Sequence, residues 1–90
     1  MDFPAGLRAS NDAGIEFLRT ELSLAHTFLN VATATKHPER RLQSLEHAHE
    51  AYRAILRFLP RLQLSAKQKL DFDRQLAVLK EQLMLAGIEP

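Results

Sequence analysis

The sequence of 90 residues contains no cysteine, only three glycines and only four prolines, and the first two of these scarcities exclude several classes of site. Without cysteine there is no disulfide framework, no thiolate metal ligand and no cysteine nucleophile. The glycines lie at positions 6, 14 and 87, too far apart to form a glycine-rich phosphate loop. No apolar run approaches the roughly 18 residues that a membrane span requires, so we expect no membrane helix.

The remaining composition is that of a soluble globular domain. Hydrophobic residues make up 46% and charged residues 26% of the chain, which excludes a disordered tail. The formal net charge of +1 predicts no strong attraction to nucleic acid or to an anionic membrane. Residues 1–6 have neither a basic segment nor an apolar one, so we expect no secretory signal and a cytoplasmic protein.

Apolar residues recur at spacings of three and four in three long segments, the pattern of helices with one buried face. We expect helices over about residues 12–36, 38–59 and 65–86, preceded by an irregular segment at residues 1–11. Because the connections are short, consecutive helices must run antiparallel. The sequence therefore predicts an all-α protein whose residues 12–90 form an up-down-up antiparallel three-helix bundle.

Short polar residues, a proline and a glycine mark the expected helix ends. Their side chains or backbone preferences satisfy the free N–H and C=O groups of the terminal turns. The positions are a cap at Asn11 or Asp12, Pro38 at the start of the second helix, the Ser65–Gln68 capping box, and Gly87 followed by Ile88.

Each helix has a main apolar stripe that we expect to form the core. The first comprises Ile15, Leu18, Leu22, Ala25, Leu29 and Ala32, and the third comprises Phe72, Leu76, Leu79, Leu83 and Ala86. In the second helix the stripe is Leu42, Leu45, His49, Tyr52, Leu56 and Leu59, with Ala48, Ala51, Ile55, Phe58 and Leu62 forming an adjoining one.

Candidate catalytic and metal-binding residues are few. Glu46 and His49 form the Glu-x-x-His pair of di-iron bundles, but the third helix offers no histidine for the second pair that such a site needs. No serine lies in a Gly-x-Ser-x-Gly turn. We therefore expect no catalytic residue, no metal and no cofactor. For His49 we expect a half-buried ring whose nitrogens are hydrogen-bonded; the alternative is a buried ligand or a pH-sensitive core group.

Some large apolar side chains lie outside the main stripes, and we expect them to bind a protein partner. Contiguous exposed apolar surface usually marks such a site. A groove between the first and third helices would accept a partner helix, and the same strip could instead pair with its copy in a twofold dimer. The candidates are Phe17, Leu24, Phe28, Val78 and Leu85.

Basic residues at the second corner of the bundle suggest an alternative function. Residues 36–70 carry eight basic and three acidic groups. The alternative is a nucleic-acid or phosphate-binding module, although no exposed aromatic side chain is expected that could stack on bases. Acidic residues of the first helix could also screen this corner. The basic candidates are Arg53, Arg57, Arg61, Lys67 and Lys69.

The second helix resembles that of a known family. Its segment Leu45-Glu46-His47-Ala48-His49-Glu50-Ala51-Tyr52-Arg53-Ala54-Ile55-Leu56 combines small alanines with a tyrosine and an aliphatic pair. In this it looks like the central helix of MIT (microtubule-interacting and trafficking) domains and, more loosely, a tetratricopeptide-type helix. The similarity covers about residues 15–86 in length and helix order. It implies docking of a peptide helix in an interhelical groove, without catalytic residues.

Overall fold

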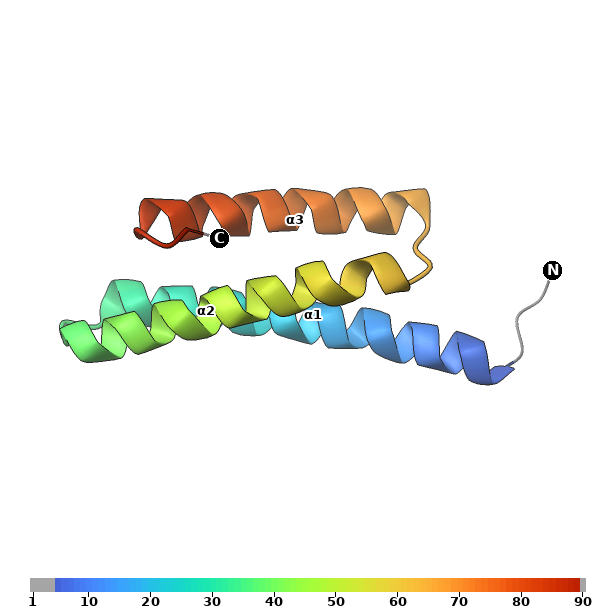
Figure 1. The fold of residues 1–90 in the computed structure, drawn as a ribbon, viewed down its shortest axis with the longest axis horizontal. Helices are drawn as coiled ribbons and strands as arrows, with labels where there is room; N and C mark the ends of the chain where they lie inside the picture. The colour runs from blue at the N-terminus through green and yellow to red at the C-terminus, as the bar shows by residue number, and fades with distance from the viewer. Residues whose placement is uncertain (1–4, 90) are drawn as a thin grey trace.

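The structure, a computed structural model, describes residues 5–89, with side chains described for residues 10–89. It contains α1 (Ala5–Ala34), α2 (Pro38–Phe58), the short 3-10 helix η1 (Leu59–Arg61) and α3 (Ala66–Leu85). The described part of the chain has no strand. Helices α1 and α2 form an antiparallel pair, and α3 lies along one side of that pair (Figure 1). The predicted all-α three-helix bundle is confirmed.

The first helix begins earlier than the sequence suggested. An irregular segment is predicted at residues 1–11, but α1 already starts at Ala5, so the prediction is wrong from there on; residues 1–4 lie outside the described residues. Asn11 does not cap the helix. Its Nδ2 donates to the Gln63 carbonyl (3.0 Å), and its Oδ1 accepts from the Gln63 backbone N–H (2.7 Å). We call these two hydrogen bonds the Asn11 clasp. They pair the polar atoms of the Asn11 side chain and tie α1 to the segment before α3.

A glycine one turn further along α1 lets the same segment approach closely. A Cβ atom added to Gly14 would lie 2.5 Å from Cδ2 of Leu62. Leu62 packs against the core from this position. The absence of a side chain at residue 14 therefore provides the space in which Leu62 lies.

The ends of α3 follow the predicted chemistry. The Ser65 Oγ accepts from the Gln68 backbone N–H at 3.1 Å, and the Gln68 side chain accepts from the Ser65 backbone N–H at 2.9 Å. At the other end Gly87 has a positive φ of 89°, and the Ile88 N–H donates to the Leu83 carbonyl at 2.9 Å. Ile88 packs against the core. The capping box and the glycine-terminated end are both confirmed.

The turn between α1 and α2 is set by a proline. His37 is extended, with φ −89° and ψ 116°, as expected for a residue that precedes proline. Pro38 opens α2, as predicted, because the first turn of a helix needs no hydrogen bond from that N–H. The three residues 35–37 form the connection, so α1 ends at Ala34, slightly before the expected position.

The core contains the main stripes of α1 and α3 and a mixture of both α2 stripes. In α2 the buried apolar residues are Ala48, Ala51 and Ile55 of the adjoining stripe, together with Leu45 and Tyr52 of the main one. Leu42 and Leu56, expected in the core, are 53% and 45% exposed, so that part of the prediction is wrong. The buried apolar residues are Ile15, Leu18, Leu22, Ala25, Leu29, Ala32, Leu45, Ala48, Ala51, Tyr52, Ile55, Phe72, Leu76, Leu79 and Leu83.

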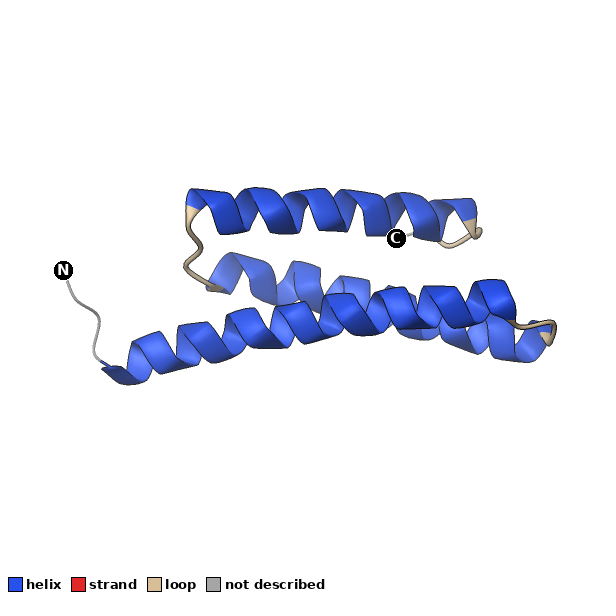
Figure 2. Cartoon of the chain, turned by 180° about the vertical axis from the view of Figure 1, so that it is seen from behind, coloured by secondary structure: helices blue, strands red, loops and turns tan. Residues whose placement is uncertain are grey.

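Small buried residues explain why α1 and α2 pack extensively. Ala25 and Ala32 of α1, together with Ala48 and Ala51 of α2, are buried. Side chains of this size allow two helix backbones to approach closely, whereas α3 contributes mainly large side chains, which hold its axis farther away. The view from behind shows the close α1–α2 pair with α3 beside it (Figure 2). The α2 stripe rich in alanine therefore faces α1.

Candidate functional site

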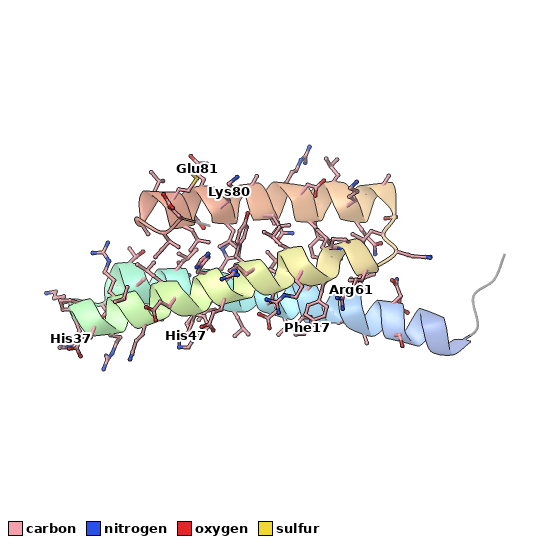
Figure 3. All side chains as sticks on the ribbon, in the orientation of Figure 1. Phe17, His37, His47, Arg61, Lys80 and Glu81 are labelled. Atoms are coloured by element: carbon pink, nitrogen blue, oxygen red, sulfur yellow. The ribbon has the colours of Figure 1, made fainter. Side chains whose placement is uncertain are left out.

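An exposed apolar strip runs along the outer side of α1 and borders α2 at Phe17 and Phe28. Phe17, Leu24 and Val31 follow one another at intervals of seven residues and are 42%, 41% and 38% exposed. Phe28 lies beside them and packs partly against the core. We call Phe17, Leu24, Phe28 and Val31 the α1 strip. Figure 3 shows Phe17 on the α1–α2 pair, on the side away from α3.

Side chains of α2 border this strip at both ends. The Phe17 and Phe58 rings meet edge to face with centroids 5.7 Å apart, and the Arg61 guanidinium lies 5.4 Å from the Phe58 centroid. Near the other end the His47 ring stacks on Phe28 at 4.9 Å. These contacts fix the aromatic rings while leaving part of their surface in solvent. The strip is thus a pre-ordered apolar surface bordered by polar groups.

The remaining two predicted partner residues lie elsewhere. Val78 and Leu85 belong to α3 and are 50% and 83% exposed. Leu85 borders a depression of about 290 Å³ between the helices, together with Leu29 and Thr33 of α1 and Gln82 of α3. Because Phe17 and Phe28 contact α2 instead, the five residues are divided between two surfaces and do not line a single groove between α1 and α3.

The predicted basic residues also separate. All five lie at the end of the bundle where α2 leads into α3, but Arg61 covers Phe58, beside the α1 strip. Lys67 borders a depression with Arg19 and Asp71, between α1 and α3. Lys69 borders another, lined mainly by apolar residues of the preceding segment. Arg53 and Arg57 are exposed on α2. The structure offers no single basic surface that unites the set.

His49 differs from the expectation in one respect. Its Nε2 atom is buried and has no hydrogen-bond partner among the described residues, so the predicted bonding of both ring nitrogens is not found. Within residues 10–89, no three histidine, aspartate or glutamate side chains are grouped so that they could hold a metal ion. In the described chain no helix is long and apolar enough to cross a bilayer.

Replacing His49 with leucine is expected to raise the free energy of unfolding by about 1 kcal/mol, because an unpaired buried polar atom costs roughly 1–3 kcal/mol. The measurement is thermal unfolding by circular dichroism, where we expect a rise in Tm of about 4–8 °C. The control His37→Leu changes a histidine that is exposed and should leave Tm nearly unchanged. A lower Tm for His49→Leu would show that the His49 ring makes a stabilising hydrogen bond after all.

Comparison of the chain with models of known families, with curated proteins and with solved structures finds no significant match in any of the three. The resemblance of α2 to the central MIT helix stays a prediction.

Proposed function

We propose that this chain is a non-catalytic protein–protein contact module whose contact surface is the α1 strip. The observation that supports this is the row of half-exposed, large apolar side chains at Phe17, Leu24 and Val31. Solvent exposure of such a row is unfavourable, by about 25 cal/mol for each Å² of apolar surface. A partner that covers the row removes this cost.

Two further features support a contact role. The aromatic rings at both ends of the strip are held by Phe58 and His47, so little side-chain freedom is lost on binding. Charged groups also stand beside the strip: Arg61 lies over Phe58, and Glu50 lies 3.8 Å from His47. An apolar centre with a polar border is the usual composition of a protein interface.

The test uses the full chain and a labelled synthetic peptide of three leucine heptads. We expect either saturable peptide binding or a solution mass above 10.2 kDa, measured by fluorescence anisotropy and by light scattering. Leu24→Glu should weaken the observed association by about tenfold or more, because a charge would be buried at the contact.

Met84→Glu is the matched control, since it introduces the same charge at a residue of α3 that is 58% exposed. We expect it to associate as the unmodified chain does. If the unmodified chain neither bound the peptide nor self-associated, the proposed contact surface would be contradicted. An equal loss of association in both variants would contradict it as well.

A further inference from the structure

The outer side of α1 carries a second helical seam, distinct from the core stripe. Its positions alternate at intervals of four and three residues, which is the heptad spacing of a coiled coil. All of them are exposed, although α1 buries another face in the bundle. The seam spans about 32 Å at 1.5 Å per residue. Its members are Ala13, Phe17, Thr20, Leu24, Thr27, Val31 and Ala34.

Large and small side chains alternate strictly along this seam. Phe17, Leu24 and Val31 are the large members, and each is flanked on the seam by alanine or threonine. In an antiparallel pair of helices, the two kinds of heptad position face each other. A second copy running in the opposite direction therefore presents a small residue to every large one.

Two antiparallel registers, seven residues apart, satisfy this alternation, and we take the one that also brings Glu16 of one copy near Lys36 of the other. Phe17 comes opposite Ala34 of the second copy, Thr20 opposite Val31, and Leu24 opposite Thr27. A parallel pair would instead set each large residue against itself and leave the alanine and threonine layers unfilled. Gaps of that kind forfeit packing contacts. Antiparallel is thus the direction in which the seam is complementary to its own copy.

Charge complementarity favours the same direction. Asp12 and Glu16 lie near one end of the described seam, and Lys36, Arg40 and Arg41 lie at the opposite end, where α1 leads into α2. Antiparallel pairing sets the acidic end of each copy beside the basic end of the other. Parallel pairing sets like charges together, which opposes association.

The hydroxyl of Thr27, the threonine nearest the centre of the pairing, does not oppose burial. The Thr27 hydroxyl donates to the Ser23 carbonyl within α1, at 3.0 Å. Its hydrogen is therefore already bonded, and its methyl group is available for contact with Leu24 of a second copy.

We infer that the partner of the α1 strip is a second copy of this chain, bound through an antiparallel, twofold pairing of the two α1 helices in the register given above. The inference rests on the proposed contact function and names its partner. A contact in which the same surface serves both subunits is the usual form of a twofold dimer.

Solution mass tests whether the partner is a second copy. Light scattering of the full chain at increasing concentration should show a rise from 10.2 kDa toward twice that value. Leu24→Glu should shift this rise to at least about tenfold higher concentration, and Met84→Glu should not. A chain that stays monomeric but binds the heptad peptide would overturn the inference and leave the contact function standing.

Cysteine cross-linking tests the register, and the chain has no native cysteine to interfere. Thr20→Cys chains mixed with Val31→Cys chains under mild oxidation should form a disulfide-linked heterodimer. Each variant alone should cross-link poorly, because equivalent residues would lie about 16 Å apart along the axis, from eleven residues at 1.5 Å each. A disulfide requires Cα atoms within about 7 Å.

Light scattering and cross-linking together distinguish failure of the inferred pairing from failure of the proposed function. Homodimers of Thr20→Cys that form more readily than the mixed product would indicate parallel pairing or the other antiparallel register, and either would overturn the inference. A light-scattering dimer that gives neither product would place self-association on another surface, again against the inference. Absence of both dimer and peptide binding would instead contradict the proposed function itself.

Discussion

Replacing Phe72 with alanine is expected to lower the free energy of unfolding by about 3–5 kcal/mol. Phe72 is 1% exposed and is among the largest fully buried side chains. It also lies under the Arg19 guanidinium, 5.5 Å from the ring centroid, and so joins α3 to α1. A domain of this length is stable by only about 5–13 kcal/mol. The substitution should therefore remove a large share of the total stability.

Urea unfolding followed by circular dichroism at 222 nm measures this loss. The matched control is Leu70→Ala, which shortens a side chain of the same helix that is 54% exposed; its effect should stay below about 0.5 kcal/mol. If Phe72→Ala were equally mild, α3 would not be held in place by Phe72, and the core described above would be wrong at that point.

Enlarging Ala48 to leucine is expected to cost about 1–3 kcal/mol, although the substitution adds apolar surface. Ala48 of α2 is fully buried, as is Ala25 of α1. Three additional carbon atoms have no space there, so the two helices must move apart. Leucine is almost as good a helix former as alanine, and the loss can therefore be assigned to packing.

Ala77→Leu supplies the comparison, because Ala77 is exposed on α3. The same urea measurement should show almost no change for it. Equal stability of Ala48→Leu and the unmodified chain would mean that the alanines do not determine the separation of α1 and α2.

Much of the fold could be predicted because single residues control it locally. Ser65 with Gln68, Pro38 and Gly87 act within one helical turn, and their neighbours in sequence are their partners in space. The α1 stripe was predictable for a similar reason, since its spacing alone defines one face. The start of α1 was not predictable, because the Asn11 side chain forms its hydrogen bonds with the backbone of Gln63, a residue far away in the sequence, and does not cap the helix.

Predicting which face of α2 is buried would have required the positions of the neighbouring helices. Both of its stripes are apolar, and the choice depends on which one can approach α1 most closely. The stripe with the alanines packs against α1, and Leu42 and Leu56 are left about half exposed. Hydrophobicity alone ranks leucine above alanine, so the sequence pattern indicated the wrong members.

The residues of the α1 strip were predictable only in part: Phe17, Leu24 and Phe28 were among the expected partner residues, whereas Val31 was not, and Val78 and Leu85 lie on α3. The exposure of Phe17, Leu24, Val78 and Leu85 follows from an excess of apolar residues over what the core can hold. Which of them share a surface depends on the rotation of each helix about its axis. Phe58 and His47, which border the α1 strip, come from α2 and could be added only once that rotation was known.

The Asn11 clasp has a consequence for the order in which the chain folds. It joins residues 52 positions apart. Closing a flexible loop of that length costs roughly 3.5 kcal/mol of chain entropy, more than two exposed hydrogen bonds return at about 1 kcal/mol each. The clasp therefore cannot form first; it closes after the helical hairpins have brought α1 and the α3 start together. It is also the contact that a partly unfolded chain would lose early.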